Sequence, residues 1–177
     1  CGVAVLVLLR CGLTGFQQAY TWVGGAPLDD ELMFRAAQAI TAGEWLGAYD
    51  YLTLSKAMFF PVWLALLHVL HLPYLVSGAA LWCAASLLAA FAFAPLWRNA
   101  EPGCGRVLTL GLFGALAFLP SSWAAYTLRV YRDNIFPALC LVFFAGMAGM
   151  ALRAVFYTAK QKPLWPWLLA AGVGLAC

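Results

Sequence analysis

The feature that most constrains this chain is the run from Tyr74 to Trp97, which contains no charged side chain. About 20 consecutive apolar residues are enough for a helix to cross the hydrocarbon core of a bilayer. Of the 177 residues, 65% are hydrophobic and 10% are charged, whereas soluble domains average roughly 45–50% and about 25%. A chain of this length cannot hide so much apolar surface from water, so the composition predicts that lipid surrounds it.

Short polar turns divide the rest of the chain into further apolar runs. Only helices and closed barrels satisfy the backbone in lipid, and these runs are too long for barrel strands. We therefore predict an all-α, polytopic transmembrane helical bundle that forms a single domain over residues 1–177. The predicted spans are residues 1–23, 74–97, 107–127 and 135–157, with another span starting at 164–177.

Both ends of the chain resemble cut ends. The sequence starts without Met inside an apolar run, and its last run, 164–177, is shorter than a span requires. We therefore expect the chain to be the N-terminal fragment of a longer membrane protein.

Residues 24–58 are predicted to form the first external loop. Glycine and proline at 24–27 end the first span, because they cannot continue a helix cheaply. Asp29, Asp30 and Glu31 then open an amphipathic helix that we expect to stop near Gly43. A short apolar helix at Phe59–His71 is expected to lie at the interface or to be half inserted.

Acidic residues are divided unevenly between the two sides that alternating spans define. The 98–106 turn and the 153–163 loop hold five basic residues against Glu101 alone, so we place them in the cytoplasm. The 24–58 loop and the 128–134 turn are therefore expected to be extracytoplasmic, in a multi-pass protein of the plasma (inner) membrane. They hold the other six of the seven acids: Asp29, Asp30, Glu31, Glu44, Asp50 and Asp133.

The adjacent acids Asp29 and Asp30 have two interpretations. Two neighbouring carboxylates at a membrane surface repel each other, which favours protonation of one and suits a general base. Alternatively, one of them caps the following helix, and Glu31 forms an i,i+4 ion pair with Arg35. Spacing alone leaves both readings open.

Asp133 is the third candidate acid, and it lies in the turn that also carries Arg129 and Arg132. It can also begin the next span as a cap, since Pro137 follows. Its turn shares a membrane side with Asp29 and Asp30, so the two acidic sites can converge.

Three basic residues are candidates for binding a phosphate: Lys56, Arg129 and Arg132. Each lies at the predicted headgroup level, and arginine gives bidentate contacts to phosphate. For Lys56, simple snorkelling to the interface is the competing explanation. The net charge of +3 includes no basic block, so no nucleic-acid partner is expected.

Metal binding has little support in the sequence. His68 and His71 are spaced i,i+3, but they lack a neighbouring acid and lie among apolar residues, which favours packing. We therefore assign no metal ligand, and a divalent cofactor is possible but unsupported. Gly146 and Gly149 are predicted to allow close contact between helices.

The order of these features resembles the start of the GT-C glycosyltransferases, integral membrane enzymes that use lipid-phosphate sugars. The similarity extends to protein mannosyltransferases and to the aminoarabinose transferases of lipid A. It is carried by DDELMFRAAQAITAGEWLGAYDYLTLSKAMFFPVWLALLHVLHLP (Asp29–Pro73) and YRDNIFP (Tyr131–Pro137).

The resemblance implies an enzyme that moves a sugar from a polyprenyl-phosphate donor to an extracytoplasmic acceptor. It assigns the base that deprotonates the acceptor to Asp29 or Asp30, an assisting acid to Asp133 and a donor-phosphate contact to Lys56. The alternatives are a transporter or channel segment, in which ionisable residues line a pathway, and a structural membrane subunit.

Overall fold

The computed structural model describes residues 2–21, 29–45, 47, 57–157 and 163–177. Throughout these residues the regular structure is helical and no strand forms, which confirms the predicted all-α class. Four 3₁₀ helices connect the longer elements: η1 (Ala94–Trp97), η2 (Pro120–Trp123), η3 (Ala125–Leu128) and η4 (Arg132–Asn134). The α-helices are α1 (Gly2–Gly15), α2 (Asp29–Thr41), α3 (Phe59–Val69), α4 (Tyr74–Phe93), α5 (Pro102–Ala117), α6 (Phe136–Phe156) and α7 (Trp165–Ala176).

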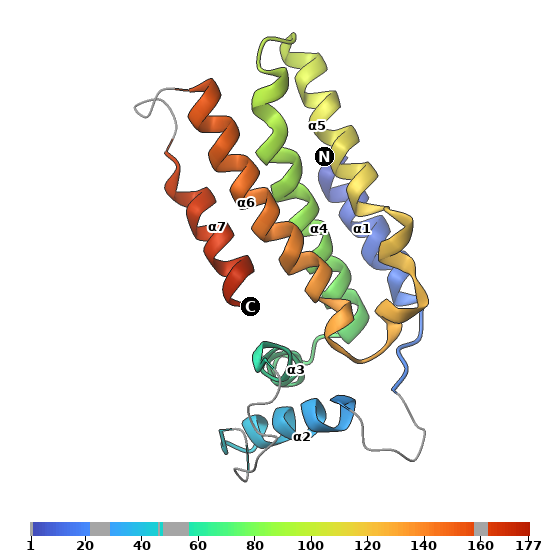
Figure 1. Cartoon of the computed structure of the whole chain (residues 1–177). Helices are drawn as coiled ribbons and strands as arrows, with labels where there is room; N and C mark the ends of the chain where they lie inside the picture. The colour runs from blue at the N-terminus through green and yellow to red at the C-terminus, as the bar shows by residue number, and fades with distance from the viewer. Residues whose placement is uncertain (1, 22–28, 46, 48–56, 158–162) are drawn as a thin grey trace.

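The helices form two layers (Figure 1). Helices α1, α4, α5, α6 and α7 run side by side as a bundle, and α2 and α3 lie across one end of it. The α5–α6 connection, which contains η2, η3 and η4, lies at this same end. The candidate acids of α2 are therefore placed close to the turn that carries Arg129 and Asp133.

Helix α4 is the centre of the bundle because it presents small side chains to several neighbours. Phe113 of α5 is fully buried against the α1–α4–α5 contact, and Ala145 of α6 is buried on the other side of α4. Small residues allow helix backbones to approach closely. The buried small residues of α4 are Gly78, Ala79, Cys83, Ala85, Ser86, Ala89, Ala90 and Ala92.

Helices α6 and α7 pack through glycines. A methyl group added at Gly146 would lie 2.5 Å from the backbone nitrogen of Ala171, and one at Gly149 would lie 2.0 Å from the ring of Trp167. Gly174 makes the reciprocal contact, since a methyl group there would lie 2.5 Å from the nitrogen of Phe143. The close helix contact predicted for Gly146 and Gly149 is thus confirmed.

Two predicted spans are shorter helices in the structure. Helix α1 ends at Gly15, because Tyr20 instead exchanges backbone hydrogen bonds with the α5–α6 connection, at 3.1 Å to Leu128 and 2.9 Å from Val130. Helix α5 ends at Ala117 rather than continuing to 127, since Pro120 has no N–H and starts η2. Helices α4 with η1 and α6 closely match their predicted spans.

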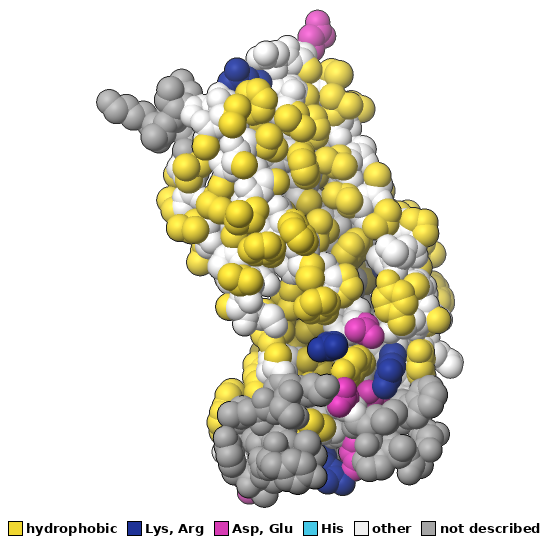
Figure 2. Space-filling view, in the orientation of Figure 1, with side chains coloured by type: hydrophobic (Ala, Val, Ile, Leu, Met, Phe, Trp, Pro, Cys, Tyr) yellow, Lys and Arg dark blue, Asp and Glu magenta, His cyan; other side chains and the backbone are white. Residues whose placement is uncertain are grey.

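Two helical segments among the described residues are long and apolar enough to cross a membrane, namely Tyr74–Trp97 and Phe136–Phe156. Length and composition alone make this weak support for membrane association, since core helices of soluble proteins meet the same criteria. Apolar side chains cover much of the visible face of the bundle, whereas charged side chains gather near α2 and at the opposite end (Figure 2).

We predict that Gly146→Ala destabilises the protein by about 1–3 kcal/mol, because the added methyl group overpacks a backbone contact that cannot yield. Gly172→Ala is the control, since a methyl group there meets no atom within 4 Å. Thermal unfolding of the purified protein should show a lower midpoint for the first variant alone. Equal midpoints would show that α6 and α7 are not packed through Gly146.

Candidate functional site

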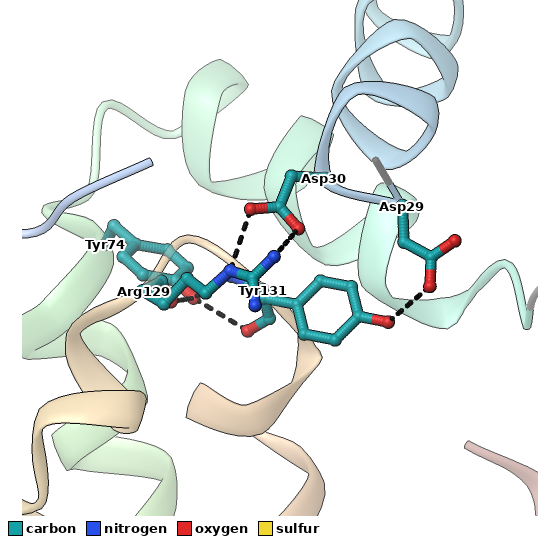
Figure 3. A network of polar contacts seen from close by, with 5 residues as sticks. All are labelled: Asp29, Asp30, Tyr74, Arg129 and Tyr131. Carbon is teal, nitrogen blue, oxygen red and sulfur yellow. Dashed lines mark hydrogen bonds and ion pairs between the residues drawn. The ribbon is translucent and has the colours of Figure 1, made fainter. Parts of the chain in front are cut away.

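The candidate site lies where the first turn of α2 meets the α5–α6 connection (Figure 3). Asp29 and Asp30 come from α2, Arg129 and Tyr131 come from the connection, and Tyr74 begins α4. These segments are far apart in sequence, and hydrogen bonds between side chains hold them together.

Asp30 and Arg129 form a bidentate ion pair. Nε of Arg129 donates to Oδ2 of Asp30 at 2.9 Å, and Nη2 donates to Oδ1 at 2.6 Å. The Asp30 side chain is 8% exposed and that of Arg129 is 26% exposed. The hydrogen bond to Asp30 raises the pKa of Arg129, so its guanidinium remains charged. Paired fork geometry sets the orientation of both groups as well as their distance.

Asp29 contacts the same connection through Tyr131. The Tyr131 hydroxyl donates to Oδ2 of Asp29 at 3.1 Å. The Tyr131 ring is buried and lies 5.0 Å from the Arg129 guanidinium carbon, measured to the ring centroid. The two adjacent carboxylates in the first turn of α2 therefore bind two different side chains of the α5–α6 connection.

Tyr74 holds the backbone of this turn in place. Its hydroxyl lies 3.1 Å from the carbonyl oxygen of Arg129 and 3.0 Å from that of Tyr131, and it accepts from the Tyr131 N–H at 3.3 Å. Beneath the turn, an apolar cluster packs Met33 of α2 against Phe60 of α3 and Ile135. The polar contacts thus lie on a well-packed base.

The other predicted site residues lie nearby, outside this network. Arg132 is exposed, with its guanidinium carbon 5.5 Å from the Tyr131 ring centroid, and it forms no ion pair with described residues. Asp133 is partly exposed and lines a separate polar cavity. Lys56 lies outside the described residues. The structure thus brings Asp29, Asp30 and Arg129 together.

Helix α2 begins at Asp29, so both aspartates lie in its first turn. Acids in this position are stabilised by the positive end of the helix dipole. The i,i+4 ion pair between Glu31 and Arg35 forms as predicted, and both side chains are exposed, at 41% and 75%. The acids of this turn therefore combine a local helical role with contacts to the distant turn.

Sequence reasoning missed both tyrosines. Tyr131 stands inside the YRDNIFP motif, and Tyr74 follows Pro73 at the start of the longest apolar run. Buried tyrosines usually find a hydrogen-bond partner. A tyrosine beside clustered charges was therefore the only signal available for Tyr131, and nothing in the sequence marked Tyr74.

His68 and His71 line a groove of about 700 Å³ between α2 and α3. Both are exposed, and their ring centroids lie 6.5 Å apart. Both histidines are therefore exposed in a groove, whereas the sequence predicted that they pack among apolar residues. Among the described residues, no group of three or more His, Cys, Asp or Glu side chains is placed to hold a metal ion.

Comparisons of the chain with protein-family models, curated proteins and solved structures find no match to any of them.

We predict that the Asp30–Arg129 pair stabilises the fold. Asp30→Asn and Arg129→Gln should each lower the free energy of unfolding by about 1–3 kcal/mol, because each removes the oppositely charged group that the other residue of the pair binds. The double variant should lose at least about 0.5 kcal/mol less than the sum, since the two residues are coupled. Chemical unfolding of the four proteins measures this cycle.

Glu31→Gln is the matched control, because it breaks an exposed ion pair one residue away. Such pairs contribute about 1 kcal/mol at most. Strict additivity of Asp30→Asn and Arg129→Gln would contradict the pairing.

Proposed function

We propose that the chain is part of a membrane glycosyltransferase that moves a sugar from a polyprenyl-phosphate donor to an acceptor on the extracytoplasmic side. The observation that carries the proposal is the junction of Asp29 and Asp30 with the turn of Arg129 and Tyr131. Group transfer from a lipid-linked phosphate needs a base and cations close together at the membrane surface. This junction supplies the base, and Arg132 beside Tyr131 supplies an exposed cation, at one end of an apolar bundle (Figure 2).

The two aspartates have different roles in this proposal. Both oxygens of Asp30 accept from Arg129, and Asp30 is 6% exposed, so we assign it to positioning the turn. Asp29 is more exposed and accepts from the Tyr131 hydroxyl through Oδ2. Asp29 is therefore the proposed base that takes the proton from an acceptor hydroxyl.

Among the basic residues that the structure describes, Arg132 is the best placed to bind the donor phosphate. It is exposed beside Tyr131, whereas Arg129 already binds a carboxylate. Displacement at the sugar's anomeric carbon would release the polyprenyl phosphate, whose negative charge a guanidinium stabilises bidentately. Lys56 remains a proposed second contact.

A polytopic location in the plasma membrane is part of the proposal. Helices on the outside of the bundle expose large apolar side chains, among them Leu8 at 72%, Val155 at 77% and Leu175 at 75%. Apolar surface of this extent is unusual on soluble monomers. The uneven division of acids supports an extracytoplasmic site.

Transport is the competing function. The observation that would favour it is that a charged residue, Arg10, is buried within the apolar helix α1. Ionisable residues inside apolar helices commonly mark pathways. The guanidinium of Arg10 nevertheless donates to the carbonyl oxygens of Ala117 and Ser122 and stacks 3.6 Å from the ring centroid of Trp123. A cation held this firmly by neutral acceptors supports a structural role.

We predict that Asp29→Asn lowers sugar transfer by roughly 10²–10⁴-fold, which is the usual contribution of a general base. Asparagine keeps the size of the side chain, so α2 should remain folded. The measurement is transfer from a lipid-linked sugar by the full-length protein in membranes. Glu31→Gln should retain full activity, since that acid lies outside the network. Unchanged transfer by Asp29→Asn would remove the main support for an enzyme.

A second prediction concerns topology. Exposed Cys104, kept as the sole cysteine, and Glu44→Cys in a cysteine-free background should react with a membrane-impermeant thiol reagent from opposite sides. Glu44 follows α2, which lies across one end of the bundle. Cys104 lies in the first turn of α5, which begins at the opposite end (Figure 1). Labelling of both from the same side would contradict the proposed arrangement.

A further inference from the structure

The end of the bundle that lies away from α2 carries a group of basic residues. Arg98 follows η1, Arg106 lies in the second turn of α5, and Arg153 lies in the last turn of α6. These segments meet at the end opposite the candidate site (Figure 1). Glu101 is the single acid of the turn between α4 and α5, and it forms no ion pair with the described residues. The positive charge of this end is therefore not neutralised within the described part of the chain.

Contacts with the end of α6 fix the direction of the Arg98 guanidinium. Its Nη1 donates to the carbonyl oxygen of Phe156, the last residue of α6. Its guanidinium carbon lies 5.1 Å from the ring centroid of Phe156 and 5.8 Å from that of Tyr157. The last carbonyls of a helix lack partners within the helix and carry partial negative charge, which favours a cation there. Arg98 therefore has a defined orientation although it is exposed.

The other edge of the Arg98 guanidinium is open. Its Nε and Nη2 form no hydrogen bond with the residues that the structure describes. Arg129 uses the same two atoms to hold both oxygens of Asp30, and this fork matches the oxygens of a phosphate equally well. Arg153 differs, because both of its Nη atoms donate to backbone carbonyls of α4 and α6. Arg98 thus presents an oriented, unused fork to its surroundings.

Aromatic side chains around Arg98 are typical of the depth at which lipid headgroups lie. Trp97 precedes Arg98, and its Nε1 donates to Oγ1 of Thr109 at 3.0 Å, which fastens η1 to α5. Tyr157 lies on the other side of the guanidinium. Tryptophan and tyrosine are enriched at both membrane–water interfaces. These contacts favour a lipid phosphate as the group that meets the fork.

Exposed apolar side chains lie beside the same segments. Leu96, two residues before Arg98, is 53% exposed, and Val155, next to Phe156, is 77% exposed. Inorganic phosphate would leave this apolar surface uncovered, whereas the acyl chains of a lipid would cover it. The combination of an open fork and exposed apolar residues therefore selects an amphiphilic anion over a free one.

A second exposed cation lies on the adjoining helix. A methyl group added at Gly105 would lie 3.4 Å from the Trp97 ring, so these two positions are in contact. Arg98 and Arg106 each follow one of them in the chain. Arg106 is exposed and makes no hydrogen bond or ion pair with described residues. Each basic residue near a membrane surface adds to the attraction of anionic headgroups.

We propose that Arg98 binds the phosphate of an anionic phospholipid through Nε and Nη2, with Arg106 adding electrostatic attraction. The lipid belongs to the cytoplasmic leaflet, which is the anionic one. The inference is independent of sugar transfer, because η1 follows the end of α4 that lies away from α2 (Figure 1). Phosphatidylcholine carries the same phosphate, but its ammonium group cancels the charge, so phosphatidylglycerol is the preferred ligand.

The experiment is native mass spectrometry of the full-length protein in detergent, titrated with phosphatidylglycerol or with phosphatidylcholine of the same acyl chains. We expect the unmodified protein to bind phosphatidylglycerol about tenfold more tightly. Arg98→Gln should weaken this binding by about tenfold or more, because it removes two charge-assisted hydrogen bonds. Arg98→Lys should restore part of it, since lysine keeps the charge and lacks the fork.

Arg35→Gln is the matched control, because it removes the same charge from an exposed side chain of α2. It should leave phosphatidylglycerol binding unchanged. Arg106→Gln should weaken binding by about fivefold, the contribution of one basic residue near an anionic surface. Arg106 has no described partner to lose, so this variant tests the site even if Arg98→Gln unfolds the protein.

Equal affinity of the unmodified protein for the two lipids would overturn the inference. So would equal losses in Arg35→Gln and Arg98→Gln, because binding would then depend on net charge and not on this end of the bundle. Inorganic phosphate in millimolar excess should not displace phosphatidylglycerol. Displacement would assign the fork to a free anion and contradict the lipid. Loss of phosphatidylglycerol binding in Arg98→Gln, with phosphatidylcholine binding unchanged, would support the site.

Discussion

The bidentate pair of Asp30 and Arg129 joins two segments separated by 99 residues of chain. Helix α2 has only 13 residues, and isolated helices of this length are marginal in water. Its position across the end of the bundle therefore depends on contacts with other segments. The apolar contact of Met33 with Phe60 supplies burial, and the ion pair supplies orientation. Without that orientation, Asp29 would have no defined place relative to Tyr131.

The buried Arg10 and the partly buried Arg153 stabilise the bundle in a common way. Arg10 binds the carbonyl oxygen of Ala117 at the end of α5, and Arg153 binds those of Phe91 and Ala92 near the end of α4. The last carbonyls of a helix lack internal partners and carry partial negative charge. Each guanidinium also lies over a tryptophan, at 3.6 Å from Trp123 for Arg10 and 3.8 Å from Trp167 for Arg153. An arginine in an apolar helix is thus satisfied without any carboxylate.

Much of the site was predictable because its charged residues stand out in a chain of low charge. Asp29, Asp30 and Arg129 are conspicuous against apolar runs, and span alternation places their segments on one side. Their pairing was not predictable, since α2 offers three successive acids and the turn offers two arginines. Which acid meets which arginine depends on the rotation of α2 about its axis. Burial of Met33, Ala36 and Ala37 decides that rotation.

The fold, like the site, was predictable from the sequence only in part. Helices α4 and α6 follow directly from long apolar runs, because such runs have one low-energy backbone conformation in an apolar surrounding. The early ends of α1 and α5 were harder to foresee. Tyr20 leaves the helical pattern to bond with Leu128 and Val130, a contact between segments distant in sequence.

By itself, the sequence determined the helical class, the glycine contact of α6 and the grouping of acids, because hydrophobicity, side-chain size and charge are local properties. Only the tertiary structure decided that Asp30 holds Arg129, that Tyr74 and Tyr131 order the turn, and that Arg98 binds the end of α6. Each of these depends on distances between segments that neither periodicity nor composition encodes. Hydrogen bonds form over about 3 Å, and only the packing of the whole bundle fixes positions that closely.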